Sequence, residues 1–173
     1  MSALTDLRTR VQSVNDALQT GELVRNAVVR HGADIMELQK TQLLLGLTSS
    51  GEDFRPYYSE DLKPSGYFHS VETAGRYAAW KESGIRYPYS VSGRNPDAPN
   101  LYITGKFYDE IDVEFGADAV AVIGVTGFAK TIMAKYGGSS FGLMASNWRV
   151  LFMERGAYAE LMDEIKTKLN GRN

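Results

Sequence analysis

The sequence predicts a single α+β domain over residues 1–173, with an antiparallel β-hairpin or small sheet flanked by an N-terminal helical region and a C-terminal helix. Three observations predict this class. Apolar residues recur at helical spacing near both ends of the chain. All five prolines lie between residues 56 and 99, so the flanks are free to form long elements. After residue 99, two β-prone runs joined by a short connection are typical of a hairpin.

An amphipathic helix is expected over residues 1–20, with Gly21 as its stop. Its apolar residues share one narrow stripe. They are Leu4, Leu7, Val11, Val14 and Leu18. Because an isolated helix of this length is marginal in water, it needs a partner. A stripe this narrow suits a single neighbouring helix, so we expect the segment to dock on a neighbouring subunit, outside its own core.

Further helices are predicted by the same spacing of apolar residues. They span residues 22–47, 69–83, 128–136 and 148–169. A break is expected within the first of these at His31–Gly32 and within the last at Gly156, because glycine ends helices readily.

The strand region is expected to begin after Pro99, where Leu101 and Ile103 alternate with other residues. From residue 107 to 115 an apolar face alternates with a polar one. The apolar face holds Phe107, Ile111, Val113 and Phe115, and the other holds Tyr108, Glu110, Asp112 and Glu114. A tight connection at Gly116–Ala117 leads to a second run, 119–123, which predicts an antiparallel hairpin.

Composition excludes several classes of protein. Hydrophobic residues make up 43% and charged residues 23% of the chain, which are values of a folded globular domain and not of a disordered one. No window is long and apolar enough for a membrane span, and the polar N-terminus is unlike an export signal. Without cysteine there is no disulfide and no thiolate site. A net charge of −2 argues against extensive phosphate binding.

Ser140 is the one candidate nucleophile, because Gly138–Gly142 fits the pattern G-x-S-x-G. That pattern marks a nucleophile only after a buried strand and with a histidine further along the chain. A helix is predicted before Ser140, and both histidines, His31 and His69, precede it. We therefore interpret the segment as a glycine-rich turn.

Acidic residues form the only other chemical cluster. Asp109, Glu110, Asp112 and Glu114 could meet a hard cation such as calcium, but carboxylates in a straight row surround an ion poorly. An exposed strand face fits them better. His31 and His69 have no partner at metal-site spacing. We predict no catalytic residue, no metal site and no cofactor, and hence a protein that is not an enzyme.

Residues 51–100 are predicted to form a loop-rich aromatic interface region. Basic and aromatic residues alternate there as they do on stacking surfaces for single-stranded nucleic acid, and also at protein interfaces. They are Arg55, Tyr57, Tyr58, Lys63, Tyr67, Arg76, Tyr77, Trp80, Lys81, Arg86, Tyr87 and Tyr89. The acidic net charge favours the protein interface.

Three segments, taken in order over about residues 33–170, resemble a known family. The first contains Gln42-Leu43, Gly46, Gly51 and the loop 55–59, the second is Leu101–Tyr108, and the third runs from Phe128-Ala129 through Lys135–Gly137 to Phe141–Leu143. They are similar to segments of the tailed-bacteriophage head–tail joining, tail-completion or virion-morphogenesis proteins of the neck. Phe128 stands where that family usually has Tyr, and Lys135 where it has an acidic residue.

The resemblance implies a structural virion protein that forms a homo-oligomeric ring in the neck, head–tail connector or tail. Its partners would be other copies and the portal, neck or tail proteins, with no membrane partner. DNA would pass through the ring lumen without specific contact, and the chain would be made in the host bacterial cytoplasm. The alternatives are a phage-associated cell-wall hydrolase and a small nucleic-acid-binding module.

Overall fold

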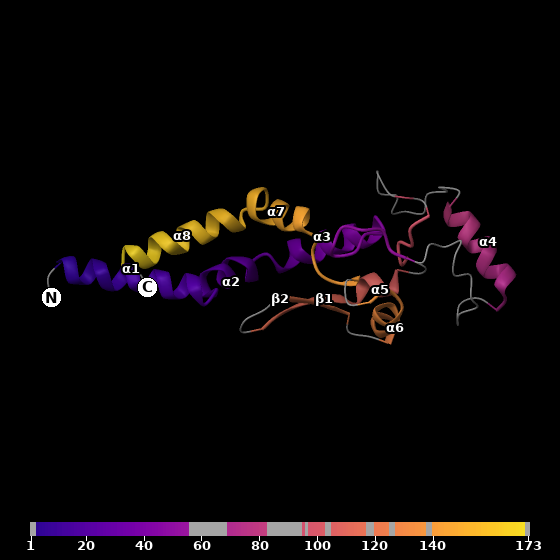
Figure 1. Cartoon of the computed structure of the whole chain (residues 1–173), viewed down its shortest axis with the longest axis horizontal. Helices are drawn as coiled ribbons and strands as arrows, with labels where there is room; N and C mark the ends of the chain where they lie inside the picture. Colours follow the sequence, from indigo (N-terminus) through magenta and orange to yellow (C-terminus); the bar gives the residue numbers. More distant parts are fainter. Residues whose placement is uncertain are drawn as a thin grey trace.

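The protein is elongated and mainly helical in a computed structural model that describes residues 3–55, 69–82, 95, 97–102, 105–116, 120–124, 127–137 and 140–171 (Figure 1). Helix accounts for 66% of the structure, in eight helices within these described ranges. The predicted α+β class is therefore wrong, and the protein is essentially all-α. The sequence indicates which segments favour strands. It does not indicate that the sheet has only two strands in the described part of the chain.

Strands β1 (Ile111–Phe115) and β2 (Val120–Gly124) form an antiparallel ribbon in which Ile111 pairs with Gly124 and Phe115 with Val120. A two-stranded ribbon is too small to be stable by itself, and this one packs against neighbouring helices. In the described part of the chain no further strand extends the ribbon. The hairpin is thus a local feature attached to a helical protein.

Two antiparallel rows of helices form the long part of the molecule (Figure 1). Helices α1 (Ala3–Gln19), α2 (Glu22–Val29) and α3 (Gly32–Leu44) follow one another in the first row. Helices α7 (Ala145–Met153) and α8 (Ala157–Leu169) return beside them, with α8 against α1 and α2 and α7 against α3. We call α1, α2 and α8 the helical arm.

The expected breaks at His31–Gly32 and Gly156 are confirmed, since α2 ends at Val29 and α8 begins after Gly156. Gly156 has a φ of 98°, a left-handed conformation that glycine adopts without strain. The end of α1 at Gln19 follows the same logic, because Gly21 has a φ of 75°. At each of these turns one helix ends and the next begins, and the row continues along the molecule (Figure 1).

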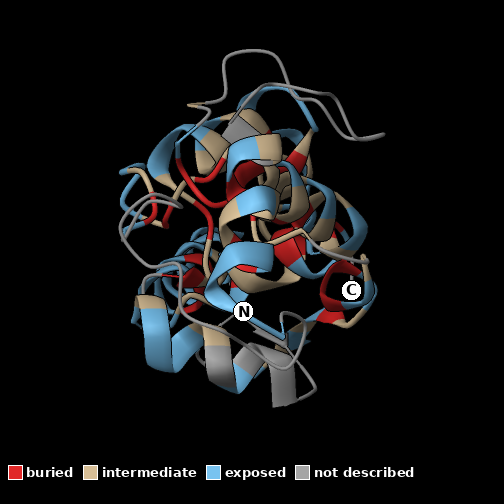
Figure 2. Ribbon diagram, turned by 90° about the vertical axis from the view of Figure 1, so that its right-hand side faces the viewer, coloured by how far each residue is buried: buried red, intermediate tan, exposed pale blue. Residues whose placement is uncertain are grey.

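Buried residues form three clusters along the molecule, and in a view down its long axis they lie toward the centre (Figure 2). The arm cluster joins α1 and α2 to α8, and a middle cluster joins α2 and α3 to α7, α8 and β1. The third, which we call the Phe54 core, joins the end of α3 to helix α5 (Lys106–Asp109), β1 and helix α6 (Gly127–Tyr136). Its buried members are Leu43, Phe54, Phe107, Tyr108 and Ile111.

Backbone hydrogen bonds cap the C-terminal end of α3. The amide of Leu47 donates to the carbonyl of Gln42 at 3.1 Å and that of Gly46 to Leu43 at 3.0 Å, the paired bonds of a Schellman cap. Gly46 has a φ of 79°, and a Cβ there would stand 2.8 Å from the Cβ of Ala98. The position therefore requires glycine both for its conformation and for the close approach of the chain at Ala98.

Residues 106–109 form a helix and not the beginning of the predicted strand. Phe107 and Tyr108 are neighbours in sequence and both are buried, which a strand with alternating faces would prevent. Gly105, with a φ of 86°, allows the chain to turn into α5.

Helix α4 (Val71–Glu82) and α6 lie within or close to the predicted ranges. The hydroxyl of Tyr77 in α4 donates to the carbonyl of Tyr102 at 2.7 Å.

Candidate functional site on helix α1

Helix α1 presents three different faces along its length. The first packs against α8, where Val14 and Ala17 are 8% and 4% exposed. They contact Leu161, Ile165 and Leu169 of α8 in the arm cluster. The prediction that the whole stripe lies outside the subunit core is therefore wrong for Val14, which belongs to the core of its own chain.

The second face is apolar and uncovered by the described part of the chain. Leu4 is 79% exposed, Leu7 54%, Val11 51% and Leu18 42%. Single exposed apolar residues are ordinary, but four on one side of one helix form a continuous stripe. We call these four residues the exposed stripe.

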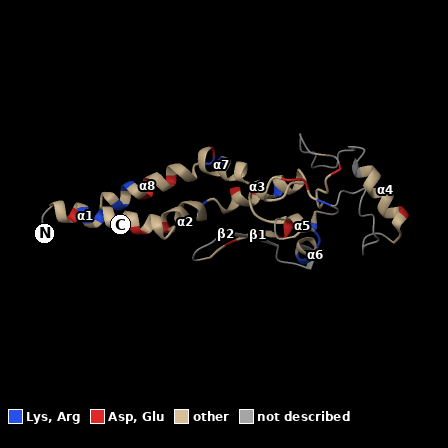
Figure 3. Ribbon diagram, viewed as in Figure 1, with Lys and Arg blue, Asp and Glu red and all other residues tan. Residues whose placement is uncertain are grey.

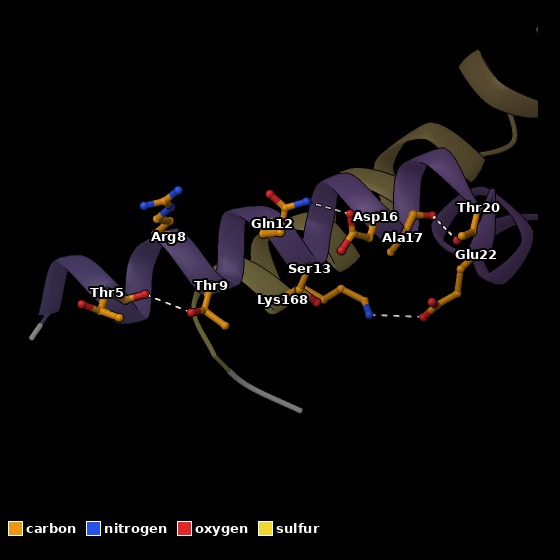
Figure 4. Close-up of a pocket in the computed structure, with 10 residues that line it drawn as sticks. All are labelled: Thr5, Arg8, Thr9, Gln12, Ser13, Asp16, Ala17, Thr20, Glu22 and Lys168. Carbon is orange, nitrogen blue, oxygen red and sulfur yellow. Dashed lines mark hydrogen bonds and ion pairs between the residues drawn. The ribbon is translucent and has the colours of Figure 1, made fainter. Parts of the chain in front are cut away.

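The third face is polar and forms a shallow groove beside α8 (Figure 4). Its side chains bond to near neighbours: Gln12 Nε2 donates to Asp16 Oδ1 at 2.9 Å, and Thr9 Oγ1 to the carbonyl of Thr5 at 3.0 Å. Lys168 Nζ pairs with Glu22 Oε1 at 3.2 Å across the groove. These contacts are those of a solvated helix face.

Helix α1 extends beyond its partner at the N-terminal end (Figure 1). Arg10 Nη1 donates to the carbonyl of Leu169, the last residue of α8, at 3.2 Å, and Arg10 also pairs with Asp6. The turns of α1 before Arg10 therefore project past α8. Since Leu4 and Leu7 lie on this projecting part, their exposure follows from the length of α1.

Ser140 has the geometry of a turn residue. It is fully buried, and its Oγ donates to the carbonyl of Gly137 at 2.7 Å. Helix α6, not a strand, precedes it. A nucleophilic serine needs an exposed hydroxyl that is bonded to a base. The hydroxyl of Ser140 instead closes the turn after α6.

His31 lies at the junction of the two helical rows, inside a charged cluster. Its Nδ1 is 2.8 Å from Asp34 Oδ2, and its buried Nε2 is 3.6 Å from Glu160 Oε1. Arg155 pairs with Asp34 at 3.2 Å, and Arg30 with Glu160 at 3.2 Å. Acidic and basic residues are interspersed in this way along the arm (Figure 3). The cluster joins the α2–α3 turn to the α7–α8 turn.

Of the four predicted acidic residues, only Asp112 and Glu114 lie on the same strand. Asp112 and Glu114 are exposed on β1 and alternate with Ile111 and Val113, as expected of a strand with one face in solvent. Asp109 lies in α5, and Glu110 lies in the turn before β1. Across the described ranges, no group of three metal-binding side chains is arranged to hold an ion.

The predicted aromatic interface region is described only in part. Arg55 is the last described residue before position 69, and Arg76, Tyr77, Trp80 and Lys81 lie on α4. The rings of Tyr77 and Trp80 are 5.8 Å apart. The other predicted members lie outside the described residues: Tyr57, Tyr58, Lys63, Tyr67, Arg86, Tyr87 and Tyr89. His69 stands just before α4 and is exposed.

A buried amide network was missed by the sequence reasoning. Gln42 Oε1 accepts from the amide of Met144 at 2.9 Å and from Asn147 Nδ2 at 3.0 Å, and Gln42 Nε2 donates to the carbonyl of Gly142 at 2.9 Å. Gln39 Oε1 accepts from the amide of Gly142 at 2.9 Å. Both glutamines are fully buried. The available signal was that Gln39 and Gln42 share the helical face of Ile35 and Leu43, where buried amides need partners.

No known protein family, curated protein or solved structure matches this chain. The likeness to phage neck proteins consequently depends on the short segments in the sequence. In the described part of the chain, no helix combines the length and apolar character that crossing a bilayer requires.

Proposed function

We propose that this chain is a structural virion protein of a tailed bacteriophage, a subunit of an oligomeric ring in the neck, head–tail connector or tail. The observation that carries the proposal is the exposed stripe on a helix that projects from an elongated arm. A subunit of a ring needs surfaces that bind its own copies and the adjacent layers. The stripe provides one such surface, and apolar helix faces commonly lie in grooves of partner proteins.

Two further features fit this role. The three segments that resemble neck proteins follow one another in the expected order along the chain. Asp112 and Glu114 give β1 an exposed acidic face, and such a face in a ring lumen would repel the phosphates of passing DNA.

The test is to locate the protein in particles. Phage particles produced from a genome that carries this gene should contain the protein at a fixed copy number per particle, measured by quantitative mass spectrometry. Antibody labelling in the electron microscope should place it at the neck or tail. Its absence from virions, or turnover of peptidoglycan by the purified protein, would overturn the proposal.

A matched pair of variants tests the surface itself. Leu4→Asp with Leu7→Asp should abolish incorporation into particles while leaving cooperative unfolding intact, because both residues are exposed. Thr5→Asp with Thr9→Asp adds the same charge on the polar face of the same turns and should be incorporated normally. Equal incorporation of both variants would show that the stripe is not an assembly surface.

A further inference from the structure

We propose that Asn170 is a modification site, where the side-chain amide is lost by spontaneous deamidation at a rate set by the contact of Arg10 with the end of α8. This inference goes beyond a role in the virion, because it concerns the chemistry of the chain itself in water. It depends on the sequence around Asn170, on the conformation of the last turn of α8 and on the position of Arg10.

The sequence favours deamidation at one asparagine. Asn170 is followed by Gly171, and no other asparagine of the chain precedes a glycine. A glycine on the C-terminal side leaves the peptide nitrogen unshielded by a Cβ and lets the backbone turn freely. Within the described residues, Asn15 and Asn170 are the two exposed asparagines, and Asn15 precedes Asp16. Asn170 therefore combines exposure with the reactive neighbour.

The reaction needs only the chain and water. The main-chain nitrogen of Gly171 gives up its proton and attacks Cγ of Asn170, which forms a C–N bond and closes a five-membered succinimide ring. The bond from Cγ to Nδ2 breaks, and Nδ2 takes up a proton and leaves as ammonia. Water then adds to one of the two ring carbonyls and opens the ring to aspartate or isoaspartate. The product carries a carboxylate, which is ionised at neutral pH, in place of the neutral amide.

The folded end of α8 holds the two reacting groups out of position. Asn170 has a ψ of −2°, which eclipses the nitrogen of Gly171 with the nitrogen of Asn170. Ring closure needs the Gly171 nitrogen on the side of Cβ, about 120° further around the tetrahedral Cα. The amide of Gly171 also donates to the carbonyl of Lys168 at 3.2 Å, and that of Asn170 donates to the carbonyl of Lys166 at 2.9 Å. The last turn must therefore open before the reaction can proceed.

Arg10 of α1 holds this turn closed. Its Nη1 donates to the carbonyl of Leu169, the residue before Asn170, at 3.2 Å. Its guanidinium also lies against Gly171, since a Cβ at that position would stand 2.6 Å from Cζ of Arg10. The ion pair of Arg10 with Asp6 fixes the guanidinium from within α1. Opening of the last turn has to displace this guanidinium, so the contact between α1 and α8 slows the reaction.

Peptide mapping by mass spectrometry measures the loss of the amide at Asn170 in the full-length protein, incubated in mildly alkaline buffer. In urea, where the turn is absent, the rate is the intrinsic rate of the unfolded chain. In the folded protein it should be about tenfold lower, because two backbone hydrogen bonds must break first. Asn15 in the same digest is the internal control and should keep its amide under both conditions. Equal rates at Asn170 in the folded and unfolded protein, or faster loss at Asn15 in urea, would overturn the proposal.

A matched pair of arginine variants tests the contact. Arg10→Ala removes the bond to Leu169 and should raise the rate at Asn170 in the folded protein about threefold or more. Arg8→Ala removes the same charge from the polar groove of the same helix and should leave the rate unchanged. Both variants should match the parent in urea, because the effect depends on the folded end of α8. Equal rates for the two variants in the folded protein would overturn the role of Arg10. None of these outcomes bears on whether the protein is found in virions.

Discussion

Two regions of this molecule are stabilised in different ways. In the helical arm, α1 has a single neighbouring row and buries only the face that α8 covers. In the Phe54 core, side chains from α3, α5, β1 and a loop meet, and Phe54 is fully buried. Similar apolar residues are thus core in one region and surface in the other. Burial depends on how many elements meet at a residue, and helical periodicity alone does not report that number.

The largest contrast should come from truncating one apolar side chain in each region. Phe54→Ala removes a fully buried ring that contacts Tyr136 at a centroid distance of 5.1 Å, and it should cost about 3–5 kcal/mol of unfolding free energy. Leu4→Ala, in the projecting turns of α1, should change stability by less than about 0.5 kcal/mol. Urea unfolding at low protein concentration measures both. Comparable losses would mean that the projecting end is part of the folded core.

A finer comparison lies within α1 itself, between two residues of the same type three positions apart. Val14→Ala should cost about 1–2 kcal/mol, because Val14 is buried against α8. Val11→Ala should be nearly neutral in the dilute protein, because half of its surface is already exposed. Matched thermal scans of the two variants provide the measurement. A larger loss for Val11 than for Val14 would reverse the assignment of the two faces.

Much of the helical structure could be predicted from the sequence, but the fold class could not. Glycine and histidine breaks at positions 31, 32 and 156 divide the rows as predicted, because helix stops are local signals. The predicted strand began too early, at Phe107. Phe107 and Tyr108 are both buried in the Phe54 core, and they lie in helix α5. Whether a hairpin gains further strands depends on distant parts of the chain, which local patterns do not encode.

The sequence predicts which apolar residues lie on one side of α1, but not which of them are buried and which are exposed. The spacing of the stripe identifies all five residues, and the structure separates Val14 from the four others. Leu4 and Leu7 are exposed because α8 ends beside Arg10, which bonds to the carbonyl of Leu169 at a sequence separation of 159 residues. Val11 and Leu18 lie alongside α8 but on a face of α1 that is turned away from it. The Gln42 network was missed for a related reason, since its partners at Gly142, Met144 and Asn147 come from another segment.

The smallest expected effect concerns the charged cluster at the turn between the two rows. Arg155 pairs with Asp34 at 3.2 Å and with Glu37 at 3.1 Å, and its side chain is 39% exposed. Arg155→Ala should therefore cost less than about 1 kcal/mol at low salt, because partly exposed pairs gain little over solvated charges.

Raising the ionic strength to about 1 M should remove most of this loss, since the screening length then falls to about 3 Å. Arg76→Ala provides the control, because Arg76 and Glu72 form a pair on α4 whose side chains are 77% and 75% exposed. That variant should match the parent at every salt concentration. If Arg155→Ala costs several kcal/mol regardless of salt, the turn between the rows depends on Arg155 for packing and not for charge, since the stem of an arginine also covers apolar surface. The stem of Arg155 would then add to the packing that already joins the two rows in the middle cluster.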